Sequence, residues 1–357
     1  KDGRIKFDLI MKGIIFNVGS ETIKYSFFKD FEIINKEIIY AKPNKNLILN
    51  IFKKAEKEFK KIDVVAHRVV HGYGSKSNFL NKKILNNIAN AIPLAPLHNP
   101  FQLKVIKIIK KEFPKLKQFI AFDSDIFLDL PLISKIYALP TKIIKKYKIY
   151  RYGFHGLNVE NIIEELKKEN LKNAIIFHLG AGCSITAIKN FKPIETSMGF
   201  TPFEGSIMIN RSGSIDPGIV LFLIKKIGIK NTEKILNNSG IIALANTKKF
   251  EKIIMLRNKN KKYNFAFNIF CYSIAKIASS YLINFEDIDA FVFSGGIGEN
   301  SWPVREKIMK FLKVKIDKMK NIRNEKYLNN EKPYVLVIRA DEEKIILKKL
   351  KERWKQN

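Results

Sequence analysis

Short apolar runs that end in glycine recur along the chain. Residues 175–179 form one such run, which meets the turn Gly180-Ala-Gly182 before an extended pattern resumes at 185–188. An apolar run, a glycine turn and a second run together predict a β-hairpin. Residues 14–20 repeat the same shape and are again followed by a strand-like run, at 23–28. Two matching hairpins about 160 residues apart indicate a duplicated domain.

A third apolar run, residues 290–294, ends in the glycine-rich stretch 295–300. Glycine lets backbone N–H groups approach an anion with no Cβ in the way. For one turn alone, an ordinary hairpin is the simpler interpretation. Three such turns at strand ends favour a phosphate-bearing ligand, held in the cleft between the duplicated halves.

The remaining pattern alternates between strands and helices, which is typical of an α/β fold. A proline-punctuated stretch at 92–100 cannot be regular helix, and 134–150 is expected to be a connector. Residues 191–216 show no clear period, and long irregular segments inside a compact domain are usually functional. Further strands are expected at 11–39, 64–71, 119–122 and 334–338, and helices at 46–61, 81–91, 101–113, 159–169, 219–227, 264–282, 304–311 and 342–355. Residues 1–10 are expected to be an extension before the first strand.

Composition predicts a globular chain with ample core. The 357 residues suggest two domains, 46% of them are hydrophobic, and no apolar run approaches the roughly 18 residues of a membrane span. No signal peptide is expected, and two cysteines make no disulfide framework, so a cytoplasmic location is expected. The net charge of +31 comes from scattered lysines rather than one block. We therefore expect no nucleic-acid or membrane partner, while a general attraction for anionic substrates remains open.

The candidate chemistry lies around the glycine turns. All five histidines fall in irregular or strand-end stretches, and His155, with a glycine on its C-terminal side and another two residues before it, is the preferred catalytic candidate. No histidine pair has zinc spacing, and neither a P-loop nor a Gly-x-Ser-x-Gly motif is present. Arg68 lies inside an apolar strand, Arg211 in a motif-like loop, and Asp123 at a strand end. Arginine forks, a carboxylate and a histidine suit Mg²⁺-dependent phosphoryl transfer.

Ten stretches together make the sequence resemble the acetate kinases of the acetate and sugar kinase/Hsp70/actin superfamily. They run from the first predicted strand to the last predicted helix, so the resemblance covers nearly the whole chain. The stretches are 17–20 with Lys24, 67–72, 91–100, 150–156, 178–182, 197–205, 211–213, 215–217, 295–301 and 341–343.

The resemblance implies two duplicated ribonuclease-H-like domains, of the actin-like ATPase type, around an interdomain cleft. Residues 1–126 would form the N-terminal domain and 127–342 the C-terminal, nucleotide-binding domain, with a helix at 343–357 packing back on the first. The implied reaction is reversible transfer of the ATP γ-phosphoryl group to acetate, which gives acetyl phosphate and ADP. The implied assembly is a homodimer.

The resemblance also implies roles for individual residues. Arg68 and Arg211 would hold the acyl and phosphoryl oxygens, His155 would stabilise the transferring group, and Asp123 would position the substrate. Asn17 and Glu342 would serve Mg²⁺, with Mn²⁺ as an alternative. The nucleotide would be bound by Lys24, His178, Leu179, Gly180, Ala181, Gly182, Gly295, Gly296, Ile297, Gly298, Glu299 and Asn300. The acyl group would be held by Arg68 and by a methyl pocket of Val70, Leu97, Phe154 and Pro202.

Several positions depart from the family pattern. Glu21 and Ala181 stand where serine and asparagine are usual, and Ser214 stands where aspartate is usual. An Asp-x-Arg pair is absent from 245–251, which predicts loose reading of the nucleotide base. Two alternatives therefore stay open: a propionate or butyrate kinase, and a catalytically weakened homologue retained as a binding protein.

Overall fold

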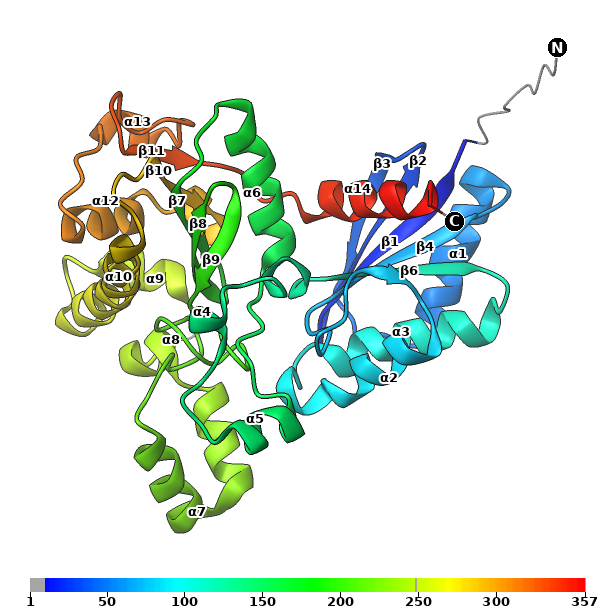
Figure 1. Cartoon of the computed structure of the whole chain (residues 1–357), viewed down its shortest axis with the longest axis horizontal. Helices are drawn as coiled ribbons and strands as arrows, with labels where there is room; N and C mark the ends of the chain where they lie inside the picture. The colour runs from blue at the N-terminus through cyan, green and yellow to red at the C-terminus, as the bar shows by residue number, and fades with distance from the viewer. Residues whose placement is uncertain (1–9, 248, 357) are drawn as a thin grey trace. The chain divides into compact units, whose positions relative to one another are not determined.

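The computed structural model describes residues 10–247 and 249–356, and it separates into two compact units (Figure 1). Unit 1 comprises Lys1–Leu128 and Asp341–Asn357, and unit 2 comprises Asp129–Ala340. Most of the extension expected at 1–10 lies outside the described residues.

Unit 1 is built on a six-stranded mixed sheet. Its strands are β1 (Lys12–Val18), β2 (Ile23–Lys29), β3 (Glu32–Ile39), β4 (Val64–Val69), β5 (Asn78–Phe79) and β6 (Lys117–Phe122). Their order is β3-β2-β1-β4-β6-β5, with β1, β4 and β6 parallel and the others antiparallel to their neighbours. The central strands are apolar on both faces because helices cover them, as is usual for parallel strands.

The helices of unit 1 follow their sequence signals closely. They are α1 (Lys45–Phe59), α2 (Lys82–Asn90), α3 (Asn99–Glu112) and α14 (Glu342–Trp354), with short 3₁₀ turns η1 (Ile92–Leu94) and η2 (Asp125–Phe127). Asn44 and Asn81 cap α1 and α2 by accepting backbone N–H groups of the first turn. Helices α1 and α3 share a core with β1, β2 and β4, while α14 packs against β4, β5 and β6.

Unit 2 repeats the same sheet with five strands. They are β7 (Ala174–Leu179), β8 (Cys183–Lys189), β9 (Lys192–Thr196), β10 (Ala290–Ser294) and β11 (Tyr334–Val337). The order β9-β8-β7-β10-β11 gives an antiparallel meander followed by two parallel strands, which matches β3-β2-β1-β4-β6 of unit 1. The duplication inferred from the two glycine hairpins is confirmed, and each unit has the ribonuclease-H-like strand order.

The helices of unit 2 differ from the expected ones in several places. They are α4 (Leu132–Lys135), α5 (Thr141–Tyr147), α6 (Gly156–Lys168), α7 (Pro217–Asn237), α8 (Gly240–Ala245), α9 (Phe250–Leu256), α10 (Lys261–Tyr281), α11 (Gly295–Asn300), α12 (Trp302–Phe311) and α13 (Lys318–Ile322), with the 3₁₀ turn η3 (Leu282–Asn284). The expected third glycine turn is wrong, because 295–300 is helix α11. The expected helix at 219–227 continues to Asn237 across a non-helical Gly228.

Two further expectations need correction. The aperiodic stretch 191–216 contains strand β9, which pairs with β8 although its sequence does not alternate. We expected no stretch long and apolar enough for a membrane span, but residues 261–284 are long and apolar enough by length and composition. Eight residues of α10 are nevertheless buried in the structure, where the helix packs against α8, α9, α12 and β8. It is a core helix of unit 2.

Candidate active site

Three of the candidate residues meet at the carboxyl ends of the parallel strands in unit 1. Asn17 lies near the end of β1, Arg68 near the end of β4, and Asp123 directly after β6. Ligands of open α/β sheets bind outside this edge. Arg68 donates from Nε to Asp123 Oδ1 at 3.1 Å and from Nη2 to Oδ2 at 2.8 Å, a bidentate pair.

The first turn of α14 brings Glu342 into the same cluster. Its Oε2 lies 2.8 Å from Arg68 Nη1 and accepts a hydrogen bond of 3.4 Å from Asn17 Nδ2. Burial alone would lower the pKa of Arg68, but the carboxylates of Asp123 and Glu342 outweigh it and raise that pKa above its ordinary value. The guanidinium is therefore a permanently charged group held in one orientation.

The donor atoms of this cluster suit a hard divalent cation. Asn17 offers an amide oxygen, and Asp123 and Glu342 offer carboxylate oxygens. Across 10–247 and 249–356, no three His, Cys, Asp or Glu side chains form a cage that would hold a metal unaided. Mg²⁺ is commonly bound by one or two carboxylates together with substrate phosphates rather than by an all-protein cage. The residues present fit a metal that arrives with a nucleotide.

In unit 2, the β7–β8 turn brings a histidine and an arginine together. A Cβ on Gly182 would lie 2.9 Å from Arg211 Nη2 and 3.3 Å from both Cε1 and Nε2 of His155. Real side chains do not tolerate the first distance without a shift of the neighbour. Glycine at 182 therefore lets both candidate side chains lie close over the turn.

Neighbouring side chains fix the orientation of His155. The residue adopts a left-handed conformation (φ 59°) at the start of α6, and its Nδ1 lies 3.0 Å from Ser184 Oγ. Its ring stacks on that of His178 with centroids 4.1 Å apart. Asn158 lies 2.8 Å from His178 Nδ1 and donates to Ser294 Oγ at 3.0 Å. The sequence did not single out Asn158 or Ser294, although Asn158 lies three residues after His155, one turn along the same helix.

Arg211 has no carboxylate partner among the described residues. Its Nη1 donates to the backbone carbonyl of Pro202 at 2.6 Å, and its buried Nε has no hydrogen-bond partner in the described parts of the chain. Burial lowers the pKa of Arg211, and no neighbouring carboxylate offsets that effect. A largely buried guanidinium with an unused donor is suited to binding an oxyanion.

The loop that carries Pro202 is held by a polar cluster that the sequence did not reveal. Tyr137 donates its hydroxyl hydrogen to Glu204 and accepts from the Phe200 N–H at 2.8 Å, while Arg151 pairs with Glu204 at 2.8 Å. Burial and the Glu204 carboxylate both raise the pKa of Tyr137, so its proton stays in place. These contacts fix the loop and, through Pro202, the guanidinium of Arg211.

Helix α11 carries the second predicted nucleotide segment, Gly295, Gly296, Ile297, Gly298, Glu299 and Asn300. Gly295 has a φ of 78°, and a Cβ there would lie 2.8 Å from the carbonyl of Leu179. That glycine is therefore required for the close packing of α11 on β7. The fully buried Arg305 donates to the carbonyls of Gly298 and Glu299 at 2.7 and 2.8 Å, and burial lowers its pKa to about 10. The sequence pattern did not predict that Arg305 binds these carbonyls of α11.

The remaining predicted residues lie in different surroundings. Leu179 is buried in β7, Gly180 donates its N–H to the Gly182 carbonyl at 2.9 Å, and Lys24 is exposed on β2. Among the predicted methyl-pocket residues, Val70 and Phe154 are buried and Pro202 is half-buried. Leu97 is 41% exposed, so in unit 1 it is not packed as a core residue.

His67 belongs to the core rather than to the chemistry. It is buried, stacks on Phe16 with centroids 5.8 Å apart, and lies 2.9 Å from Gln118 Oε1. Burial lowers its pKa to about 4. The fold therefore keeps the ring neutral.

This lowered pKa predicts acid sensitivity. The unfolded chain takes up a proton near pH 6.5, whereas folded His67 resists protonation until about pH 4, so stability falls as pH drops through that window. Because of this residue, we expect the free energy of unfolding at pH 5 to be lower than at pH 7 by about 2 kcal/mol. Urea unfolding of the wild type and of His67→Phe at both pH values measures this difference in the free energy of unfolding. An equal acid loss in both proteins would assign the effect elsewhere.

Two ribonuclease-H-like units define the actin-like ATPase fold, and their arginine, histidine and carboxylate groups around strand ends and glycine turns are typical of a phosphotransferase. The Acetokinase family model matches residues 10–348. An acetate kinase of Buchnera aphidicola subsp. Cinara cedri is 40% identical, with 96% of this chain and 94% of that protein covered. An acetate kinase of Treponema denticola is 35% identical, with 96% and 92% covered. The chain belongs to the acetokinase family.

Solved structures agree with this assignment. A propionate kinase from Francisella tularensis superimposes with a TM-score of 0.87 at 31% identity, over 94% of this chain and 98% of that one. An acetate kinase from Entamoeba histolytica gives a TM-score of 0.86 at 28% identity, over 96% and 100%. The likeness extends over almost the full length of each protein.

Proposed function

We propose that the protein is an acetate kinase, which transfers the γ-phosphoryl group of ATP reversibly to acetate. The observation that carries the proposal is the placement of Arg211 and His155 over the Gly182 turn, because phosphoryl transfer depends on positioned charge rather than on a covalent nucleophile. The test is formation of acetyl phosphate by the purified protein, compared between acetate and longer acids.

In this proposal, Arg211 binds the oxygens of the transferring phosphoryl group through its unused donors. His155, oriented by Ser184 and by the stack on His178, stabilises the charge that develops on the same group. Arg68 holds the carboxylate of acetate, and Asp123 fixes Arg68 by its bidentate pair. In this proposal unit 1 supplies Arg68 and unit 2 supplies Arg211.

The nucleotide contacts are proposed for the β7–β8 turn and α11, with Lys24 as a further phosphate contact. Backbone N–H groups around Gly180 and Gly182 would bind phosphate oxygens. The base would be read loosely, because the Asp-x-Arg pair of the family is absent from 245–251. A homodimer and a cytoplasmic location are part of the proposal on the strength of the family resemblance.

A divalent cation, Mg²⁺ or Mn²⁺, would be held by Asn17 and Glu342 together with nucleotide phosphates. Such a metal neutralises phosphate charge and orients the transferring group. Asn17 and Glu342 already contact each other and Arg68, so their oxygens are positioned before any nucleotide binds.

This arrangement predicts the metal dependence of a Glu342→Gln variant. We expect the Mg²⁺ concentration for half-maximal activity to rise by roughly 10-fold to 100-fold, as for loss of a group that supports a metal. The matched control is Glu343→Gln, the next residue of α14, which contacts Ser26 and Lys36 instead. The same Mg²⁺ dependence in both variants would contradict the assignment of Glu342.

The acyl pocket predicts selectivity for acetate over propionate. Val70 is 9% exposed, and its N–H is held by Gln102 at 3.1 Å, so the backbone cannot retreat from a larger acid. One methylene changes discrimination by about 1–3 kcal/mol. Val70→Ala should raise kcat/KM for propionate relative to acetate. An unchanged ratio would show that Val70 does not form the pocket wall.

A propionate kinase is the second candidate, because one solved neighbour is a propionate kinase. The same two arginines would serve either acid. A higher kcat/KM for propionate than for acetate in the wild type would favour it.

A further inference from the structure

Unit 1 contains a cavity of about 750 Å³ that the proposed reaction does not use. It lies at the amino ends of the parallel strands: Met11 precedes β1, Ile62 precedes β4, and Leu116 directly precedes β6. The catalytic candidates Asn17, Arg68 and Asp123 lie at the opposite, carboxyl ends of the same strands. The cavity therefore belongs to a different edge of the sheet.

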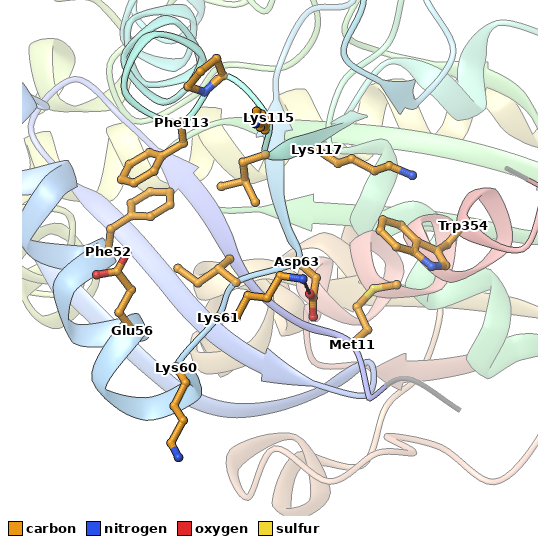
Figure 2. A pocket seen from close by; sticks show the side chains of 13 residues that line it. Met11, Phe52, Glu56, Lys60, Lys61, Asp63, Phe113, Lys115, Lys117 and Trp354 are labelled. Carbon is orange, nitrogen blue, oxygen red and sulfur yellow. Dashed lines mark ion pairs between the residues drawn. The ribbon is translucent and has the colours of Figure 1, made fainter. Parts of the chain in front are cut away.

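The floor of this amino-end pocket is apolar (Figure 2). Phe52 and Phe113 stack on each other with centroids 4.1 Å apart, and Ile62 and Leu116 are half-buried beside them. Trp354, near the end of α14, forms the facing side. The volume falls in the range of small-molecule sites, which is roughly 300–1,000 Å³.

The rim of the pocket is cationic. Four lysines line it, against the carboxylates of Glu56 and Asp63. Lys61 lies 3.8 Å from Asp63, and Lys117 lies over the Trp354 ring at 4.6 Å. Lys60 and Lys115 have no carboxylate partner among the described residues, so their charges are available to a ligand.

We propose that the amino-end pocket binds a small amphipathic anion, a straight-chain carboxylate of medium length. Its hydrocarbon chain would lie on Phe52, Phe113 and Trp354, and its carboxylate would meet one of the two unpaired rim lysines, Lys60 or Lys115, which lie on opposite sides of the pocket (Figure 2). Among the described residues, the side chains that line the pocket include no Asn, Gln, Ser or Thr that could bind the edge of a base or the hydroxyls of a sugar. This chemistry favours a hydrocarbon anion over a nucleotide.

Trp354 supplies the readout. The chain has two tryptophans, so Trp302→Phe leaves Trp354 as the only one. Titration of that variant with decanoate, below its micelle concentration, should give a saturable shift of Trp354 emission. The expected Kd is on the order of 10⁻⁴ M, which is ordinary for a ligand of about a dozen heavy atoms. Isothermal calorimetry on the wild type should give the same constant.

Charge variants test the carboxylate contact. The double change Lys60→Glu and Lys115→Glu should weaken decanoate binding by about tenfold, while Lys104→Glu, an exposed lysine on α3 outside the pocket, should not. Circular dichroism and acetyl phosphate formation should stay unchanged in both variants. An emission shift that does not saturate would overturn the proposal, as would equal binding of decyltrimethylammonium or equal loss in Lys104→Glu.

Discussion

Replacing Arg211 with alanine should lower the turnover of acetyl phosphate formation by about 10²-fold to 10³-fold, the usual effect of losing one preorganised donor from a charged transition state. Arg211 makes one backbone hydrogen bond, to Pro202, and its Nε has no partner in the described parts of the chain. The proposal gives Arg211 a role toward a ligand rather than in the fold, so the fold should tolerate the change. Thermal unfolding should show a Tm close to that of the wild type.

Arg211→Lys separates charge from geometry. Lysine keeps the positive charge but loses the planar fork, so we expect most of the turnover to remain lost. Arg323→Ala is the matched control, because Arg323 is 65% exposed and lies 3.7 Å from Glu325 in an exposed pair. Wild-type turnover in Arg211→Ala would remove Arg211 from the catalytic machinery, whereas a similar loss in Arg323→Ala would point to a general effect of lost charge.

Replacing Asp123 with alanine should affect both activity and stability. The carboxylate is 1% exposed and holds Arg68 through two hydrogen bonds, so its loss leaves a half-buried guanidinium whose partners among the described residues are Glu342 and Asn17. Breaking one side of a buried ion pair costs about 3–5 kcal/mol when no other partner remains, and we expect a smaller loss here. The KM for acetate should rise, because Arg68 is no longer fixed in orientation.

Asp125→Ala provides the comparison for Asp123→Ala. Asp125 is half-buried and pairs with Lys349 at 3.2 Å, but it does not contact Arg68 in any described interaction. Urea unfolding should show a loss of stability in both variants, whereas the rise in KM for acetate should be confined to Asp123→Ala. A wild-type KM in Asp123→Ala would show that Asp123 supports the fold only.

The sequence predicted the duplicated fold because its signal is periodic and local. The apolar runs before Gly19 and Gly180 share one pattern, and each folds as the first hairpin of its sheet. Strand β9 was missed because Lys192, Pro193 and Glu195 interrupt any alternation. It forms because β8 offers a free edge for pairing, which is a tertiary effect.

Helix α11 shows why local glycine signals mislead. Three glycines between 295 and 298 favour a turn by intrinsic preference. The helix forms because Glu299 accepts the N–H groups of Gly295 and Ala340, and because Arg305 holds two of its carbonyls. These partners are distant in sequence or unmarked by any motif, so only the fold reveals them.

The candidate site was predictable in its parts but not in its contacts. Arg68 was singled out as an arginine inside an apolar strand and Asp123 by its place at a strand end, yet their pairing depends on β4 and β6 being neighbours, which no spacing encodes. The Tyr137, Arg151 and Glu204 cluster was missed for the same reason. Its members come from a connector and a loop, and neither has a periodic pattern.

The rate of acetyl phosphate formation by the purified protein with ATP, Mg²⁺ and acetate tests the proposed activity most directly. We expect turnover that requires all three, with a kcat/KM for acetate above those for propionate and butyrate. Chelation of the metal should abolish the product, and readdition of Mg²⁺ should restore it. Absence of acetyl phosphate from a folded protein at saturating substrates would contradict the assignment of this chain as an acetate kinase.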